Sequence, residues 1–224
     1  MNWSLAKLLL CAGLLAGLAG CGRPADPARE KFSALKARAE QGEAAAQCEL
    51  AFLYIDGQGV GRDHVAAAQW LRKAADQGNA LAQFTLGGAY ASGNGVAKDE
   101  AEAVKWFRKA AEQGNADAQQ NLGVYFAQGQ VVPKDEAGAV QWFRKAAEQN
   151  HPLAQSRLAF MYANGFGGFR DPVQAHAWWN LAAGNGDRDA LQNINALEKE
   201  MNRQQINQAI SLAQQLAAQI KARK

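Results

Sequence analysis

The chain has 224 residues, of which 48% are hydrophobic and 20% are charged, and its formal net charge is +3 at pH 7. This composition predicts a packed chain, because disordered chains combine low hydrophobicity with high net charge. The small net charge, without a dense cluster of lysine and arginine, excludes the electrostatic footprint of a typical nucleic-acid-binding protein. We therefore expect no nucleic-acid partner.

Residues 1–20 have the pattern of a secretion signal. Lys7 precedes an apolar run from Leu8 to Gly20, which is shorter than the ~20 apolar residues of a membrane span. The run ends in Leu18-Ala19-Gly20-Cys21, and small residues before a cysteine resemble the bacterial lipobox. This resemblance implies cleavage before Cys21 and a lipid anchor on its thiol and amine. An ordinary secretory signal, with the cysteine incidental, is the alternative.

Cysteine usage fits export through such a signal. Cys11 would leave with the signal, and Cys21 would carry the lipid, with residues 21–27 as the lipidated cysteine and its tether. Cys48 is then the one thiol left, so we expect no disulfide within the chain. By resemblance to lipoprotein sorting signals, Gly22 favours anchoring in the outer membrane, facing the periplasm, over the inner membrane.

The central part of the chain repeats with a period of 36 residues. The octapeptide WFRKAAEQ stands at residues 106–113 and again at residues 142–149. The period defines four units of equal length: residues 44–79, 80–115, 116–151 and 152–187. A solenoid needs its core residues in every unit, whereas a catalytic site is seldom needed several times at regular spacing. The repetition therefore indicates structural units.

Each unit is predicted to form two helices. In the second unit, small and apolar residues four positions apart place the first helix at residues 80–92. A glycine-containing loop ends it, and Asp99 is a suitable N-cap for a second helix at residues 100–113. Glu102 would complete a capping box. Trp106 would fill the space that the small residues leave between the two helices.

The two ends of the chain differ from the repeat, as the capping units of solenoids do. Residues 28–43 are predicted to form an N-terminal cap helix without a first helix before it. Residues 188–224 are predicted to hold two capping helices, at residues 189–201 and 202–221. The last helix is amphipathic, so its apolar face would close the stack. The predicted fold class is therefore all-α.

The repeat resembles a known family. The pattern A-x-A-Q-x-x-L-G-x-x-Y-x-x-G-x-G-V-x-K-D-x-x-x-A-x-x-W-F-x-K-A-A-x-Q-G-N is similar to the SEL-one-like repeat, a relative of the tetratricopeptide repeat. The resemblance implies a right-handed α/α superhelix that binds other proteins as an adaptor or scaffold, often in bacterial envelopes. It implies no catalytic residue and no cofactor.

The sequence departs from the family pattern in two ways. Some relatives carry a cysteine pair in each repeat and are linked to β-lactam binding, and this chain lacks those pairs. In the fourth unit, Phe166-Gly167-Gly168-Phe169 replaces the usual loop, and Trp178-Trp179-Asn180-Leu181 replaces Trp-Phe-Arg-Lys. The two phenylalanines of the loop form either a local plug or an exposed contact.

Positions that vary between units are the candidates for a binding site. In the first helices, the positions of Ala46, Leu50 and Tyr54 keep their character, while the positions between them change. In tetratricopeptide-like solenoids the first helices line a concave surface that binds partners. We therefore predict a groove for an extended or helical peptide, lined by Phe84, Thr85, Asn121, Val124, Arg157 and Phe160. Surface drift without function is the alternative, and burial of the two phenylalanines would favour it.

No motif indicates a metal or phosphate site. The three histidines, at positions 64, 151 and 176, lack the spacing of metal ligands on a helix. The loop GQGVGRD at residues 57–63 lacks the last glycine of a dinucleotide fingerprint and follows a helix. Pairs of basic residues at 72–73, 108–109 and 144–145 form a periodic stripe, which is either a solvated face or a contact with anionic lipid or glycan.

These patterns favour a non-catalytic adaptor or scaffold of the bacterial cell envelope, which binds a protein or peptide partner in the groove. A cell-wall-related enzyme, regulator or binder of β-lactams or peptidoglycan fragments is the alternative function. A spacer without a ligand is the third. The lack of a convergent nucleophile, base or metal set argues against catalysis.

Overall fold

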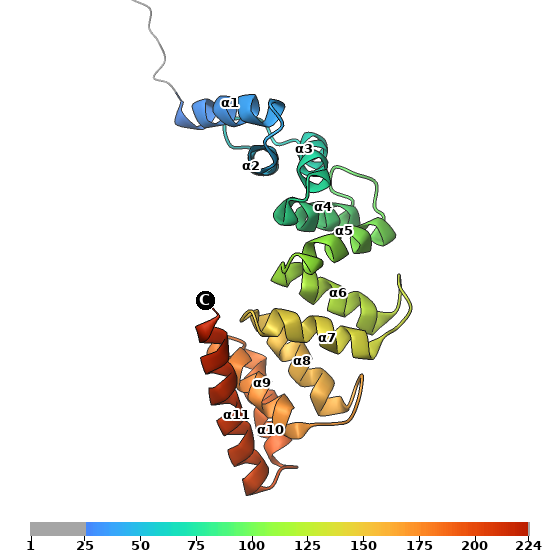
Figure 1. Cartoon of the computed structure of the whole chain (residues 1–224), viewed down its shortest axis with the longest axis vertical. Coiled ribbons are helices and arrows are strands. Elements are labelled where there is room, and N and C mark those ends of the chain that lie inside the picture. Colours follow the sequence, from blue (N-terminus) through green and yellow to red (C-terminus); the bar gives the residue numbers. More distant parts are fainter. Residues whose placement is uncertain (1–25, 224) are drawn as a thin grey trace, which may run out of the picture.

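The computed structural model describes residues 26–223, which form an elongated stack of helices (Figure 1). Eleven helices and no strand lie within this range. They are α1 (Pro27–Glu40), α2 (Ala44–Asp56), α3 (His64–Asp76), α4 (Ala80–Ser92), α5 (Glu100–Glu112), α6 (Ala116–Gln128), α7 (Glu136–Ala147), α8 (Pro152–Asn164), α9 (Pro172–Gly184), α10 (Arg188–Glu198) and α11 (Arg203–Ala222). The predicted all-α solenoid is confirmed. The predicted signal and Cys21 lie outside the described residues.

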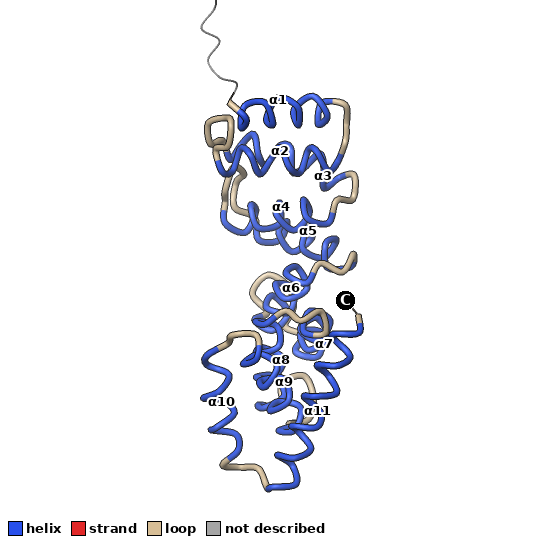
Figure 2. The backbone as a smooth tube through the Cα atoms, turned by 90° about the vertical axis from the view of Figure 1, so that its left-hand side faces the viewer, coloured by secondary structure: helices blue, strands red, loops and turns tan. Residues whose placement is uncertain are grey.

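Each unit is a pair of neighbouring helices. The first helices α2, α4, α6 and α8 pack against the second helices α3, α5, α7 and α9 of the same unit, and each of α3, α5 and α7 also packs against the next first helix. The units therefore stack in chain order along the long axis (Figures 1 and 2). At the C-terminal end, α10 and α11 both pack against α9.

Aspartate side chains define where the second helices begin. The carboxylate of each N-cap accepts a hydrogen bond from a backbone N–H in the first turn, at Asp63, Asp99, Asp135 and Asp171. The capping box predicted with Glu102 is wrong. Its carboxylate instead accepts a hydrogen bond from Lys105 Nζ at 2.9 Å, because the lysine lies about one turn further along α5.

A glycine and a phenylalanine fit together inside the second and third units. A Cβ built on Gly123 of α6 would lie 2.5 Å from the ring of Phe143 on α7. A Cβ built on Gly87 of α4 would lie 2.8 Å from the ring of Phe107 on α5. Both rings are fully buried. The glycines are required because any side chain at their positions would displace the ring.

The tryptophans occupy the boundary between units. Trp106 of α5 is 3% exposed and belongs to a cluster with Leu71 of α3, in the preceding unit, and with Leu86 of α4, in its own unit. Trp142 is only half-buried and packs against the cluster of the second unit. Trp106 therefore shares its cluster with the first helix of its own unit, as predicted, and also with the preceding unit, while Phe107 fills the space next to Gly87.

A buried glutamine joins each first helix to the preceding second helix. Gln83 Nε2 of α4 donates to the Ala75 carbonyl at the end of α3 at 3.0 Å, and its Oε1 accepts from Gln113 Nε2 at 2.7 Å. Hydrogen bonds of the same kind, with Asn185 as the last donor, are made by Gln47, Gln119 and Gln155. The Gln of the A-x-A-Q pattern therefore forms a polar contact between units.

We expect Gln119→Leu to lower the free energy of unfolding by about 1–2 kcal/mol, because buried hydrogen bonds contribute roughly 0.5–1.5 kcal/mol each. The variant loses the bonds to the Ala111 carbonyl and to Gln149. Urea denaturation followed by circular dichroism measures the change. Gln141→Leu, at an exposed position of α7, is the matched control. Equal losses in the two variants would contradict this role.

The C-terminal cap is close to its prediction. α10 ends at Glu198, three residues before the predicted end, and α11 follows an Asn202 cap that forms a complete capping box with Gln205. α11 turns Ala209 and Ile220 into the core. Within residues 26–223, neither this helix, the longest, nor any other is long and apolar enough to cross a membrane.

Candidate functional site

Two adjoining hollows lie along the first helices. One has a volume of about 560 Å³ and is lined by residues of α4, α5, α6 and α8. The other has a volume of about 630 Å³ and is lined by residues of α8, α9 and α10. Leu153 and Arg157 of α8 line both hollows, so the two form one continuous surface. We call this surface, from Gly88 on α4 to Asn193 on α10, the first-helix groove.

Four of the six residues predicted to line a groove lie in this one. Asn121, Val124 and Arg157 line the hollow next to α4, and Arg157 and Phe160 line the hollow next to α10. Thr85 lines a third hollow, of about 230 Å³ and mainly between α3 and α4, which adjoins the groove at Gly88. Its hydroxyl donates a hydrogen bond to a backbone carbonyl of α4 at 2.8 Å.

The two predicted phenylalanines have different surroundings. Phe84 is half-buried, and its ring packs against the buried Phe107 ring, with 5.8 Å between the centroids. Phe160 is 53% exposed. The burial of both phenylalanines that would favour surface drift is therefore not found: Phe84 is half-buried and Phe160 is exposed.

Gln120 on α6 also lines the groove, although it was not among the predicted residues. It is 7% exposed, and its amide makes no hydrogen bond with any of residues 26–223. In this range, Trp106 Nε1 is the only side-chain polar atom that is shielded from solvent without a partner, so the Gln120 amide opens onto the groove. The sequence signal available for this position was its variation between units, since the equivalent residues in the other units are Cys48, Phe84 and Ser156. An accessible amide without a protein partner can bind a polar group of a ligand.

The other polar groups of the groove are one cation, several amides and a phenol. Arg157 is exposed, and its guanidinium forms no ion pair with any described residue. Partial burial raises the pKa of the Tyr125 hydroxyl, Glu100 raises it further, and Lys98 opposes the change, so the phenol stays a donor at neutral pH. Further amides, which both donate and accept hydrogen bonds, come from Asn121, Gln128 and Gln130.

The loop after α8 carries two phenylalanines, one of which packs against Phe160 of the groove. Phe166, in the loop after α8, packs against Phe160 with 5.9 Å between the ring centroids. Phe169, in the same loop, is 97% exposed. The loop is therefore an exposed surface and not an internal plug.

The basic stripe takes part in the packing of aromatic side chains. Each lysine of the stripe lies over the tryptophan three residues before it, with distances from Nζ to the ring centroid of 3.9, 3.9 and 4.2 Å for Lys73, Lys109 and Lys145. Arg72 donates a hydrogen bond to the Tyr90 hydroxyl of the next unit. Cation–π contacts of this kind stabilise a fold modestly. The stripe is therefore in part structural.

The Cys48 thiol is buried in the core of the first unit. Burial, together with the neighbouring Glu49, raises its pKa to about 11. The thiol is therefore protonated at neutral pH, and only the thiolate is a strong nucleophile. No group of three or more potential metal ligands is present within the described part of the chain.

Paired helices that stack in chain order, with a groove along the first helices, define a helical repeat protein of the α/α solenoid class. The Sel1 repeat model matches the chain four times, at residues 44–79, 80–115, 116–151 and 152–187. The chain therefore belongs to the Sel1 repeat family. Proteins of this family are generally scaffolds for protein interaction and are typically not enzymes.

The solved structures that are similar to the chain include two Sel1-type repeat proteins. A protective antigen present in uropathogenic Escherichia coli strains, which displays an SLR fold, is 40% identical over 91% of this chain and 43% of its own, with a TM-score of 0.78. A Sel1 repeat protein from Oxalobacter formigenes is 36% identical over 76% of this chain and 50% of its own, with a TM-score of 0.72. The chain thus spans half or less of each relative. Comparison with curated proteins gives no match.

Proposed function

We propose that the chain is a non-catalytic adaptor that binds an extended segment of a partner polypeptide in the first-helix groove. The Gln120 amide, which lines the groove and has no hydrogen-bond partner among the described residues, is the observation that carries this proposal. Because this amide stays accessible from the groove and pairs with no protein group, a ligand can bind it without breaking a hydrogen bond of the fold. The backbone of an extended peptide supplies the N–H and C=O groups that an amide can pair with.

The remaining lining of the groove fits the same ligand. Asn121 and Gln128 add two amides, so several peptide groups of one segment could be paired. Val124 and Leu153 offer apolar contacts to its side chains. The unpaired guanidinium of Arg157 fits a carboxylate of an aspartate or glutamate in the partner. The proposed ligand is therefore an extended segment with an acidic residue near its middle.

Affinity purification from the bacterial envelope with quantitative mass spectrometry tests the proposal. We expect a partner that co-purifies with the native chain to be lost from both Gln120→Leu and Arg157→Ser. Gln141→Leu on the exposed face of α7 is the control and should retain it. Retention of all partners by both groove variants would refute the proposal. A saturable peptidoglycan fragment or β-lactam, measured by calorimetry, would instead support the cell-wall alternative.

We also infer that a lipid on Cys21 anchors the chain in the outer membrane, where the groove faces the periplasm. The support is the sequence Leu18-Ala19-Gly20-Cys21-Gly22. Several acyl chains on one residue hold a protein at a membrane stably, whereas a single chain does not.

Labelling with radioactive palmitate, followed by membrane fractionation, tests the anchor. We expect the native chain to be labelled and to sediment with outer membranes. Cys21→Ser should lose the label, and Gly22→Asp should keep the label and move to inner membranes. A Cys21→Ser variant that stays labelled, or a native chain without label, would contradict the proposal that a lipid is attached to Cys21.

A further inference from the structure

The loop of the third unit lacks a glycine that the loops of the other units have. Gly95 of the second unit has a φ of 74°, and a Cβ on it would lie 1.9 Å from the His64 carbonyl oxygen at the start of α3. Gly167 of the fourth unit lies against the start of α7 in a similar way. The third unit has Val131 at this position, and its φ is not positive, because Asn150 is the one non-glycine residue with positive φ within residues 26–223. The valine loop therefore cannot approach α5 as closely as the glycine loops approach α3 and α7.

A second departure falls at the same boundary between units. Arg72 of α3 donates a hydrogen bond to the Tyr90 hydroxyl of the next unit, and Arg144 of α7 makes the same bond with its tyrosine. The third unit has Phe126 in place of that tyrosine, and the Arg108 guanidinium lies over its ring at 5.6 Å. Because phenylalanine has no hydroxyl, Arg108 makes no side-chain hydrogen bond or ion pair with any described residue.

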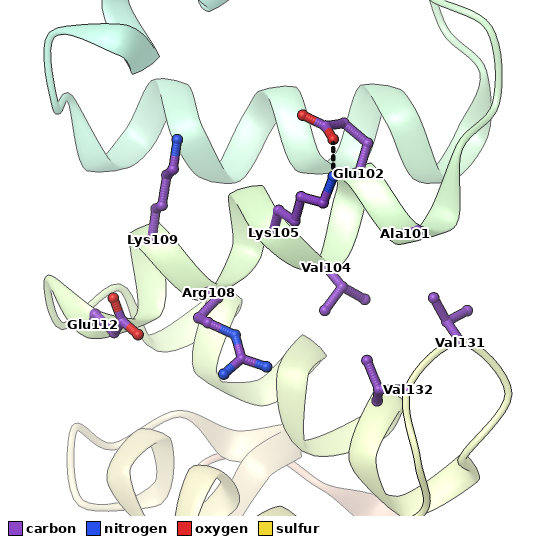
Figure 3. A pocket seen from close by; sticks show the side chains of 9 residues that line it. All are labelled: Ala101, Glu102, Val104, Lys105, Arg108, Lys109, Glu112, Val131 and Val132. Carbon is purple, nitrogen blue, oxygen red and sulfur yellow. Dashed lines mark hydrogen bonds and ion pairs between the residues drawn. The ribbon is translucent and has the colours of Figure 1, made fainter.

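The two departures coincide at a hollow of about 470 Å³ between α5 and the loop after α6. Val104 of α5 and Val131 and Val132 of the loop point toward a shared space (Figure 3). The edge of the hollow is charged and is formed by Glu102, Lys105, Arg108, Lys109 and Glu112. We call this surface the second-helix hollow.

The charged side chains at the edge of the hollow differ in whether they already have a partner within the protein. Lys105 Nζ pairs with Glu102 at 2.9 Å, and Lys109 Nζ lies 3.9 Å from the centroid of the Trp106 ring. Arg108 is exposed and forms no ion pair with a described residue. Its guanidinium only lies over the ring of Phe126. The hollow therefore combines an apolar centre with one guanidinium whose N–H donors are free.

We propose that the second-helix hollow is a second binding site, which takes an aliphatic side chain of a partner polypeptide with a carboxylate beside it. The three valines would contact the aliphatic side chain, and Arg108 would donate to the carboxylate. An apolar centre within a charged edge is the anatomy of a protein interface, and the open edge suits a side chain held by a larger partner. The second-helix hollow shares no lining residue with the first-helix groove, although α5 contributes residues to both.

Titration of the ¹⁵N-labelled mature chain, followed by amide NMR shifts, tests this site with N-acetyl-L-leucine as the probe. The probe carries one aliphatic side chain and one carboxylate, and its small size sets a dissociation constant in the millimolar range. We expect saturable shifts centred on Val104, Arg108 and Val131. N-acetyl-L-leucinamide, without the carboxylate, should bind about threefold more weakly, as expected for loss of one exposed ion pair.

Two variants separate the parts of the site. Arg108→Gln should weaken the acid about threefold and leave the amide probe unchanged, since only the ion pair is lost. Val131→Gly restores the glycine of the other units and should abolish both responses. The absence of localised shifts, or equal binding of acid and amide, would overturn the proposal. Dodecanoate that binds the same residues far more tightly than the acid would also overturn it, because the site would then be one for lipid.

Discussion

Replacement of Phe143 by alanine is expected to lower the free energy of unfolding by about 3–5 kcal/mol, the usual cost of truncating a buried aromatic side chain. The ring is 2% exposed and packs between α6 and α7, against Gly123. Because each unit contacts only its neighbours, the loss weakens the middle of the stack. Urea denaturation followed by circular dichroism measures the change.

Phe169→Ala is the matched control, because that ring is exposed and contributes no packing. We expect its effect to stay within about 0.5 kcal/mol, as for most surface substitutions. A Phe143→Ala variant as stable as Phe169→Ala would contradict the packing described for the third unit.

Gly123→Ala is expected to lower the free energy of unfolding by about 2–3 kcal/mol, because overpacking a filled core usually costs 1–3 kcal/mol. The new methyl group would lie 2.5 Å from the Phe143 ring, which is buried and cannot move aside freely. The same denaturation measurement applies, and Gly168→Ala, where a Cβ meets nothing within 4 Å, is its control.

The first unit of the chain suggests how to rescue this variant. It has Ala51 where the third unit has Gly123, and Leu71 where the third unit has Phe143, and both are buried in one cluster. We therefore expect Phe143→Leu to recover at least half of the loss caused by Gly123→Ala. A double variant whose loss equals the sum of the single losses would show that the two positions do not interact.

The helices and units were predictable because their signals recur. A period of 36 residues allows each position to be compared in four units, and the aspartate caps and glycine loops stand at the same place in each. The helix at residues 80–92 was therefore predicted with the bounds that α4 has.

The packing of adjacent aromatic residues was not predictable in the same way. Trp106 and Phe107 are 100° apart on a helix, so either could face the core, and both are buried. Their surroundings, a cluster from α3 and α4 for the tryptophan and Gly87 for the phenylalanine, follow from the angle at which the units stack. That angle is set by many contacts and leaves no local signature in the sequence.

The residues of the candidate site could likewise be predicted only in part. Variation between units selected Asn121, Val124 and Arg157, which line the first-helix groove. It could not separate Gln120, which opens onto the groove, from Phe84 at the same position of another unit, which packs against the core. Burial depends on the neighbouring side chains, so the identity of the residue at one position decides its role.

Photo-crosslinking in the native envelope tests the central claim most directly. A photoreactive amino acid replaces Val124 in the groove and, as the control, Gln141 on α7, because Lys105 at the equivalent position of α5 lines the second-helix hollow. We predict a discrete adduct with one partner polypeptide at Val124 and none at Gln141. The absence of an adduct at Val124 in a folded protein, or the same adducts at both positions, would contradict a polypeptide-binding groove.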